Sequence, residues 1–310
     1  MTLTGRHILV LGGGGFIGRH TVNALLAEGA AVRVIDLHKP ADADPRIDWR
    51  CSSLAATEDL ASTAQGCDTA IYLAGHSLPA TGNQDIAGEI SDHVIATVRT
   101  AEICAEQGVS RFVFSSSGGT VYGTDNTAPI AETAPTKPMT AYGASKLAIE
   151  HYLRIVSAHR PMRAISLRIA NPYGEGQRAG RGQGFVAAAM AAAFSGDALS
   201  IWGTGEVVRD FVHVADVAQA CLRACTYSGA HDLFNIGKGE GASLLEIVRQ
   251  VEIASGRKIN LRLCPERAID VKRNVLDIAR ARSELGWSPA IALDAGLRRT
   301  ADWWAEQDRS

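Results

Sequence analysis

The stretch His7-Ile8-Leu9-Val10-Leu11-Gly12-Gly13-Gly14-Gly15-Phe16-Ile17-Gly18 decides the fold. Its first five residues are an apolar run that predicts a short buried strand. Gly12, Gly15 and Gly18 follow at regular spacing, and the amphipathic segment from Phe16 to Glu28 predicts a helix. A strand, spaced glycines and a helix in this order are typical of a dinucleotide-binding turn. The glycines permit a tight turn and close backbone approach to a pyrophosphate, and the helix N-terminus attracts the phosphates.

A second predicted strand, Ala31 to Ile35, ends on Asp36. A carboxylate at this position accepts hydrogen bonds from an adenosine ribose and repels a 2′-phosphate. The sequence therefore favours NAD over NADP, and the alternative is an ordinary solvated aspartate at a strand end.

The rest of the first half continues the alternation of strands and helices. Strands are expected at Ile47–Cys51, Thr69–Ala74 and Arg111–Ser115, and helices at Ala55–Gln65 and Gln84–Glu106. This order predicts an α/β fold with a doubly wound parallel sheet. The loop from Gly75 to Gly82 should line the cofactor, because ligands of such sheets lie beyond the carboxyl ends of the strands.

Composition narrows the class of protein. The chain has 310 residues, 46% of them hydrophobic and 21% charged, with a net charge of −2. These values indicate a globular protein without the basic field that nucleic acid or anionic lipid would require. No apolar run approaches the ~20 residues of a membrane span, and the chain enters a strand too early for a signal peptide. The scattered cysteines and histidines suggest reduced thiols in the cytoplasm and no metal site.

The segment Tyr142-Gly143-Ala144-Ser145-Lys146 is the main candidate for chemistry. In a helix, Tyr142 and Lys146 lie one turn apart on the same face. We expect the ammonium to lower the pKa of the phenol, which makes the tyrosine a candidate general base and acid for a hydroxyl group. An amphipathic helix with a surface lysine would give the same spacing. The hydroxyls of Ser115-Ser116-Ser117, at the end of a predicted strand, support the catalytic interpretation.

Together these motifs resemble the extended short-chain dehydrogenase/reductases, in particular the NAD-dependent nucleotide-sugar epimerase/dehydratase family that includes UDP-glucose 4-epimerases. The resemblance runs over nearly the whole chain. The motifs that carry it are Gly12-x-x-Gly15-x-x-Gly18, Asp36, Tyr72-Leu73-Ala74-Gly75, Ser115-Ser116-Ser117, Tyr142-x-x-x-Lys146, Arg168-Ile169-Ala170-Asn171-Pro172-Tyr173-Gly174, Arg209-Asp210-Phe211-Val212-His213-Val214, Phe234-Asn235-Ile236-Gly237 and Leu285-Gly286-Trp287-Ser288-Pro289.

The resemblance implies a Rossmann-type NAD domain, with a smaller discontinuous α/β lobe that binds the nucleotide sugar. The expected NAD domain comprises residues 1–170 and about 206–236, and the substrate lobe comprises about 171–205 and 237–310. It also implies a homodimer in which the helices at 84–106 and 142–159 pair across subunits.

The resemblance gives each matching residue a role. The implied catalytic residues are Ser117, Tyr142 and Lys146. The implied NAD-binding residues are Gly12, Gly15, Phe16, Ile17, Gly18, Asp36, Leu73, Ala74, Gly75, Tyr142 and Lys146. The implied substrate-binding residues are Ser117, Thr120, Asn171, Trp202, Arg209, Arg267 and Asp270, where the arginines would hold the diphosphate. The basic, glycine-rich loop from Gly174 to Gly184 is either a lid over the diphosphate or a surface loop.

Three departures from the family pattern bear on the reaction. The stretch after Ser117 is one residue longer than usual, so Ser116 is the alternative active serine. Gly118 and Gly119 stand where dehydratases carry an Asp-Glu pair, which argues against dehydration. His93 stands where an asparagine is usual. The implied activity is a UDP- or dTDP-hexose 4-epimerase, the alternative is a 4-keto-6-deoxyhexose reductase, and a non-catalytic nucleotide-binding protein is the third possibility.

Overall fold

Seven parallel strands form the main sheet of the computed structural model, which describes residues 2–75, 82–124, 126–127, 129–179, 184–266 and 271–308. Their spatial order is β10-β6-β5-β4-β1-β2-β3. The strands are β1 (His7–Leu11), β2 (Ala31–Asp36), β3 (Asp48–Cys51), β4 (Thr69–Tyr72), β5 (Arg111–Ser117), β6 (Arg163–Ile169) and β10 (Leu233–Ile236). The doubly wound parallel sheet predicted from the alternating pattern is confirmed.

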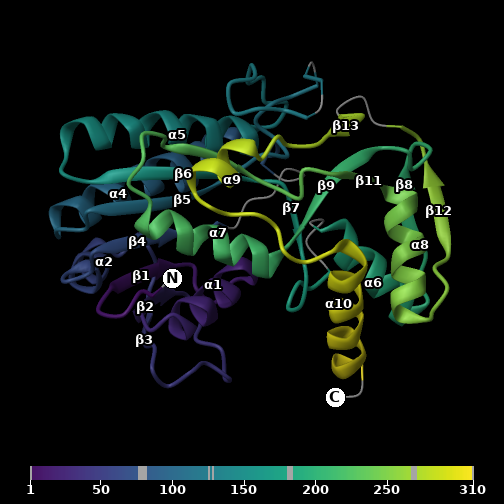
Figure 1. The fold of residues 1–310 in the computed structure, drawn as a ribbon, viewed down its shortest axis with the longest axis horizontal. Coiled ribbons are helices and arrows are strands. Elements are labelled where there is room, and N and C mark those ends of the chain that lie inside the picture. The colour runs from purple at the N-terminus through teal and green to yellow at the C-terminus, as the bar shows by residue number, and fades with distance from the viewer. Residues whose placement is uncertain are drawn as a thin grey trace.

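Helices cover both faces of this sheet (Figure 1). The apolar sides of α1 (Phe16–Ala27), α7 (Val214–Thr226) and α9 (Ala279–Glu284) share one core with it. Those of α2 (Thr57–Ala64), α4 (Ala96–Glu106) and α5 (Ala141–His159) share a second core on the opposite face. Strands buried on both sides are why the sequence shows continuous apolar runs here rather than alternation. No helix in the described part of the chain is long and apolar enough to span a membrane.

The helix predicted over 84–106 forms as three consecutive pieces. A short helix, α3 (Ile86–Glu89), continues into a π-helical segment, η1 (Ile90–Ile95), and then into α4. Single π turns inside helices often occur at functional sites. This one brings Glu89 and His93 inward, and both side chains are buried.

The remaining elements build a smaller lobe beside the sheet (Figure 1). Strands β7 (Asn171–Tyr173), β11 (Gly241–Ser243) and β13 (Arg273–Asn274) each pair with β9 (Val208–His213), and β8 (Leu199–Trp202) pairs with β12 (Leu261–Cys264). Helices α6 (Phe185–Ser195), α8 (Leu244–Ser255) and α10 (Leu293–Gln307) pack into a third core. The chain thus crosses between the two regions several times, although the lobe boundaries given above remain a prediction.

Buried polar side chains tie the two regions together. The carboxylate of Asp210, on β9, accepts backbone hydrogen bonds from Lys238 (2.6 Å), Gly239 (3.1 Å) and Leu276 (3.2 Å). Asn235, at the end of β10, is completely buried and binds three groups. Its amide oxygen accepts from the Tyr122 hydroxyl at 2.7 Å, and its amide nitrogen donates to the carbonyls of residues 130 (2.8 Å) and 277 (3.1 Å).

We expect Asn235→Ala to lower the free energy of unfolding by about 3 kcal/mol, because three polar groups each lose a hydrogen bond in the interior at once. Urea denaturation measures this change. Asn260 is exposed, so Asn260→Ala is the control and should change stability by less than about 0.5 kcal/mol. Equal effects of the two substitutions would show that the buried network contributes little.

Candidate active site

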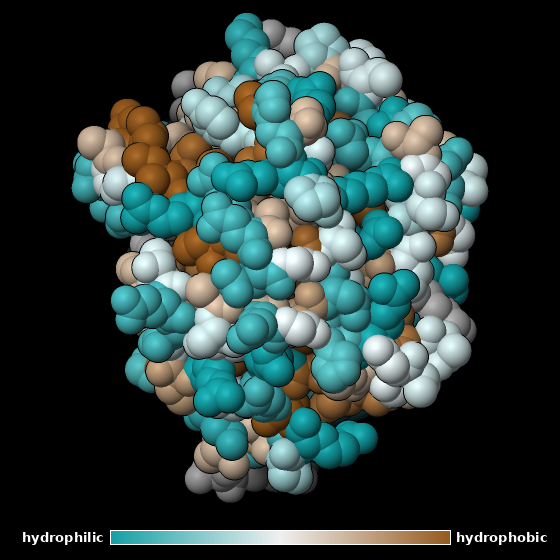
Figure 2. All heavy atoms as spheres, turned by 90° about the vertical axis from the view of Figure 1, so that its left-hand side faces the viewer, coloured by the Kyte–Doolittle hydropathy of each residue, from teal (hydrophilic) through white to brown (hydrophobic). Residues whose placement is uncertain are grey.

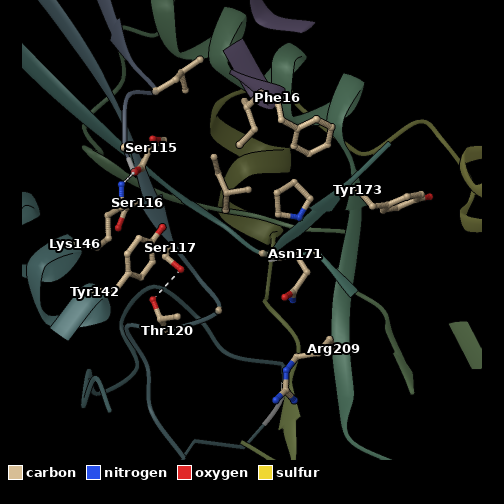
Figure 3. Close-up of a pocket in the computed structure, with 18 of the residues that line it drawn as sticks. Phe16, Ser115, Ser116, Ser117, Thr120, Tyr142, Lys146, Asn171, Tyr173 and Arg209 are labelled. Atoms are coloured by element: carbon tan, nitrogen blue, oxygen red, sulfur yellow. Dashed lines mark hydrogen bonds between the residues drawn. The ribbon is translucent and has the colours of Figure 1, made fainter. Parts of the chain in front are cut away.

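A pocket of about 550 Å³ lies at the carboxyl ends of the parallel strands. It is bounded by the start of α1, the end of β5, the first turns of α5 and strands β7 and β9, so both regions of the molecule contribute to it (Figure 3). A ligand bound at the carboxyl ends of the main sheet would therefore also contact side chains of the smaller lobe. Ligands of open α/β sheets bind in the crevice at this edge.

The glycine turn forms one wall of the pocket and is packed backbone against backbone. Gly12 has φ +86°, and a Cβ there would lie 2.6 Å from the amide nitrogen of Ala74. A Cβ on Gly18 would overlap the carbonyl oxygen of Gly12. The backbone of Gly15, Phe16 and Ile17 at the start of α1 faces the pocket. A turn where Gly12 and Gly18 leave no room for a side chain, with the positive end of the α1 dipole at the pocket, suits a pyrophosphate.

Asp36 lies beside this turn. Its carboxylate accepts a hydrogen bond of 2.9 Å from the backbone N–H of Gly14. Residues Leu73, Ala74 and Gly75 line the pocket directly after β4. Every residue predicted to bind NAD therefore lies in or next to this one region of the molecule.

Tyr142 and Lys146 point into the pocket from the first turns of α5 (Figure 3). The helix begins where the sequence suggested, since the Thr140 hydroxyl caps it by accepting the N–H of Gly143 at 3.1 Å. Lys146 is only 7% exposed. Its ammonium donates to the carbonyl of Ser115 at 2.8 Å and lies 5.5 Å from the centroid of the Tyr142 ring.

The expected lowering of the Tyr142 pKa is wrong for this structure. Burial, and secondly the negative charge of Glu89, raise the pKa of Tyr142 to about 12. Burial lowers the pKa of Lys146 to about 8, while the charges of Glu89 and Glu150 act in the opposite direction. The loss of hydration on burial therefore shifts the two pKa values more than the charge of either group shifts the pKa of the other. The spacing of the two residues in the sequence does not reveal this.

The three serines at the end of β5 have different partners. Ser115 donates to the carbonyl of Tyr72 at 3.0 Å, and Ser116 donates to the carboxylate of Glu150. That carboxylate is also held by the Arg168 guanidinium, with Nη2 2.7 Å from Oε2. Ser117 faces the pocket beside Tyr142, and its hydroxyl accepts a hydrogen bond of 2.8 Å from Thr120 (Figure 3).

The predicted substrate residues are only partly brought together. Asn171 and Arg209 line the pocket at its far side from the glycine turn (Figure 3). The Asn171 amide donates to the carbonyl of Asp210 at 3.0 Å, and the Arg209 guanidinium donates to the carbonyl of Val208 at 2.9 Å. Trp202, at the end of β8, is 41% exposed and is not among the residues that line the pocket. Arg267 and Asp270 lie outside the described residues.

Sequence reasoning missed several residues of the pocket. These are Met139, Ile169, Tyr173, Gln177, Phe185, Phe211 and Val271. Most of them are apolar and lie on the smaller lobe, where no spacing rule identifies a ligand contact. His93 also lines the pocket, and its departure from the family pattern was the one signal that pointed to it.

The parallel sheet and the glycine turn define an NAD-binding enzyme of the Rossmann type. Residues 8–237 match the model of the NAD dependent epimerase/dehydratase family. The chain belongs to this family.

Its relatives include two activities. The chain is 32% identical to a UDP-glucose 4-epimerase of Mycolicibacterium smegmatis, over 97% of this chain and 99% of the relative. It is 31% identical to a dTDP-4-dehydro-6-deoxyglucose reductase of Escherichia coli, over 94% and 95% of the two chains. Among solved structures, UDP-glucose 4-epimerase of Thermotoga maritima with UDP-glucose is 30% identical, with a TM-score of 0.92 and coverage of 97% and 99%. That of Thermus thermophilus in complex with NAD is 29% identical, with a TM-score of 0.89 and coverage of 96% and 99%.

We predict that Gly18→Ala lowers NAD affinity at least about tenfold, because the new methyl group must push the turn away from α1. Calorimetric titration of nucleotide-free protein with NAD measures the change. Asn23→Ala is the control, since Asn23 is an exposed residue of the same helix that does not line the pocket, and it should leave the affinity unchanged. A loss for Asn23→Ala as large as that for Gly18→Ala would contradict this packing account.

Proposed function

We propose that the protein is a 4-epimerase of nucleoside-diphosphate hexoses with UDP or dTDP as the nucleotide. The observation that supports this most directly is the placement of Ser117, Tyr142 and Lys146 around one pocket, opposite the glycine turn. The epimerase relatives and the structural neighbours that hold UDP-glucose or NAD support the same substrate class.

In this proposal Tyr142 is the general base and acid. Its phenolate accepts the proton of the sugar 4-hydroxyl, and the resulting phenol returns that proton when the ketone is reduced. Held at the turn of Gly12, Gly15 and Gly18, NAD would supply reversible hydride transfer at C4 of the sugar. The ammonium of Lys146 stabilises the phenolate within the same buried space, where a charge acts more strongly than in water.

Ser117 is the proposed hydrogen-bond donor to the sugar oxygen. Thr120 donates to the oxygen of Ser117 at 2.8 Å, which leaves the Ser117 hydrogen free to point at a ligand. The Ser116 proton, in contrast, is directed at Glu150. This difference favours Ser117 over Ser116 as the active serine.

The diphosphate would lie toward Asn171 and Arg209, at the other end of the pocket from the glycine turn. The Arg209 guanidinium donates to the carbonyls of Val208 and Val271, so it is held in place at the pocket wall, where its positive charge would attract an anion. Trp202 stays a proposed contact of the nucleobase, and Arg267 and Asp270 stay proposed contacts of phosphate and ribose. Gln177 and Gly184, at the two described ends of the 174–184 loop, line the pocket, which supports the lid interpretation.

A 4-keto-6-deoxyhexose reductase is the second candidate, because the reductase of Escherichia coli is as similar to this chain as the epimerases are. The two activities use the same proton transfer and differ in stoichiometry. An epimerase interconverts its sugars with no net consumption of nicotinamide, whereas a reductase oxidises one NADH or NADPH for each sugar reduced. Incubation of the protein with UDP- and dTDP-hexoses, followed by product analysis, separates them. A protein that binds these nucleotides without turnover would fit the third possibility.

We further propose a cytoplasmic homodimer. All six cysteines are free thiols, as expected in a reducing compartment. Apolar side chains on α3, η1 and α5 are 48–58% exposed; they are Ile86, Ile90, Ile95, Tyr152 and Ile155. Figure 2 shows clusters of apolar atoms on an otherwise largely hydrophilic face. An apolar surface spread over neighbouring helices supports the pairing of these helices across subunits.

We predict that Tyr142→Phe lowers kcat for epimerisation by about 10²- to 10⁴-fold, because the base is lost. Ser117→Ala should lower kcat by about 10²-fold through loss of one hydrogen bond to the reacting oxygen. Ser116→Ala is the matched control and should keep kcat within a few fold while lowering the melting temperature. The proposed roles are wrong if Ser116→Ala impairs kcat more than Ser117→Ala does.

We expect the purified protein to have the mass of two chains at micromolar concentration in sedimentation equilibrium. Ile155→Glu should shift this equilibrium toward the monomer, because a buried carboxylate without a partner is costly at an apolar interface. Ile253→Glu is the control, since Ile253 is also exposed but lies on α8. A monomeric wild type would contradict the proposal.

A further inference from the structure

A buried ion pair next to the pocket has no part in the proposed proton transfer. It joins Glu150 of α5 to Arg168 of β6, whose side chains are only 8% and 4% exposed. The guanidinium makes three contacts of 2.7–3.2 Å with the carboxylate, two from Nε and one from Nη2. Neither residue is among those that line the pocket. Such a pair adds little net stability, because the loss of hydration of both charges offsets their attraction.

Glu150 belongs to a stripe of side chains along α5 that faces the end of β5. Tyr142, Lys146 and Glu150 follow at four-residue intervals, so they lie on one face of the helix. Lys146 donates to the Ser115 carbonyl at 2.8 Å (Figure 3). One turn further along, the Glu150 carboxylate accepts a hydrogen bond from the Ser116 hydroxyl. Two neighbouring residues of β5 are thus tied to two successive turns of α5.

Arg168 extends this link to the next strand of the sheet. It is the register partner of Ser116 in the parallel pairing of β5 with β6, and both side chains reach the same carboxylate. The guanidinium carbon also lies 4.8 Å from the centroid of the Tyr122 ring, and the Tyr122 hydroxyl donates to the buried Asn235. The Glu150 carboxylate therefore connects α5 to two strands, and the arginine end of that connection is fixed in the core.

This connection bears on where the catalytic groups stand relative to one another. Tyr142 and Lys146 are on α5, whereas Ser117 directly follows Ser116 on β5. A shift of α5 over the sheet would change the separation of the Tyr142 and Ser117 oxygens, which in the proposed mechanism act on one sugar hydroxyl. Ser116 holds Glu150 by a single hydrogen bond and the guanidinium holds it by three contacts, so the ion pair is the main polar restraint.

We propose that Glu150 is a positioning residue that, through its ion pair with β6, holds the catalytic face of α5 in place opposite Ser117. This inference rests on the proposed function, because it assumes that groups of α5 and β5 act on the same oxygen of the sugar. Glu150 itself contacts neither substrate nor NAD in this proposal and transfers no proton. Its effect on the rate is large because a misplacement of about 1 Å can lower a rate about 10²-fold.

Hydrogen–deuterium exchange of the free protein tests the restraint directly. Glu150→Gln removes the charge that holds the guanidinium and keeps an acceptor for Ser116. We expect amide exchange to become at least about tenfold faster in residues 114–119 and 141–149, because opening of the helix against the strand then costs less free energy. Exchange in α10, which lies in the smaller lobe, should not change.

Glu106→Gln is the matched control for the loss of an ion pair. Glu106 is a half-exposed carboxylate of α4 that pairs with Arg160 at the end of α5. An exposed pair restrains its helices little, because water and salt screen its attraction. This variant should therefore leave the exchange of both segments unchanged.

A second variant protects the test against misfolding. Glu150→Gln leaves the charge of Arg168 buried without its partner, which is strongly destabilising. Glu150→Gln/Arg168→Met removes that charge and should recover much of the melting temperature, while the ion pair is still absent. If circular dichroism shows that the single variant does not fold, the double variant carries both measurements.

Kinetics connect the restraint to the reaction. In both variants kcat should fall at least about tenfold, because the base and the donor serine are misplaced relative to each other. KM and the dissociation constant of NAD should stay within about threefold, because binding and the chemical step depend on different contacts. A purely structural role predicts that kcat recovers together with the melting temperature in the double variant, and that result overturns the proposal. Wild-type kcat in a variant with faster exchange overturns it as well.

The exchange measurement requires neither NAD nor substrate, so it separates this proposal from the proposed function. Unchanged exchange in both segments of a folded variant overturns the positioning role of Glu150, whatever the activity of the protein. Faster exchange in a protein whose wild type turns over no sugar contradicts the proposed function and still supports the restraint of α5 by Glu150.

Discussion

Backbone lies directly against backbone where β1, β4 and α1 meet, and the rest of the pocket depends on this close approach. A side chain at Gly12 would collide with the amide of Ala74, and one at Gly18 with the carbonyl of Gly12. The start of α1 and the end of β4 can therefore lie side by side and present main-chain groups to the same ligand. Since the whole of β4 pairs with the first four residues of β5, Arg111 to Phe114, the serines that directly follow Phe114 are placed at a fixed distance from that turn.

A second constraint is the burial of two ionisable groups on one helix. Burial shifts the pKa of Tyr142 upward and that of Lys146 downward, so both groups are biased toward their neutral forms. A neutral tyrosine is a poor base, and a neutral lysine cannot stabilise a phenolate. The site therefore requires compensating charges. The negative charges of Glu89 and Glu150 favour the ammonium of Lys146, and the positively charged ring of an oxidised nicotinamide would add a charge that favours the phenolate.

The sequence was sufficient for β1 to β5 of the main sheet, the glycine turn and the shared face of Tyr142 and Lys146, because each depends on local spacing, whereas β6 and β10 were not predicted. Gly12 and Gly18 reveal a backbone contact, and a four-residue spacing on a helix fixes a shared face. The sequence was insufficient for features that depend on packing between segments far apart in the chain. The partner of Ser116 is on α5, and the direction of the Tyr142 pKa depends on burial by the whole fold. The exposure of Trp202 depends on how β8 and β12 lie at the edge of the smaller lobe, which no motif specifies.

The open space beside Ser117 bears on which of the candidate reactions the site supports. Gly119 lines the pocket, and a Cβ built there would approach only Ser117 Oγ, at 4.0 Å. The position is therefore open, and among the residues that the structure describes no acidic side chain lies within 4 Å of it that could protonate a leaving hydroxyl. A sugar oxidised at C4 has to rotate before it can accept the hydride on its opposite face, and this rotation requires free volume near the reacting carbon. A reductase has no such requirement, because its ketone needs to present only one face. Open space next to the donor serine, in a pocket lined by residues of both lobes, therefore supports the proposed epimerase, and product analysis decides between epimerisation and reduction.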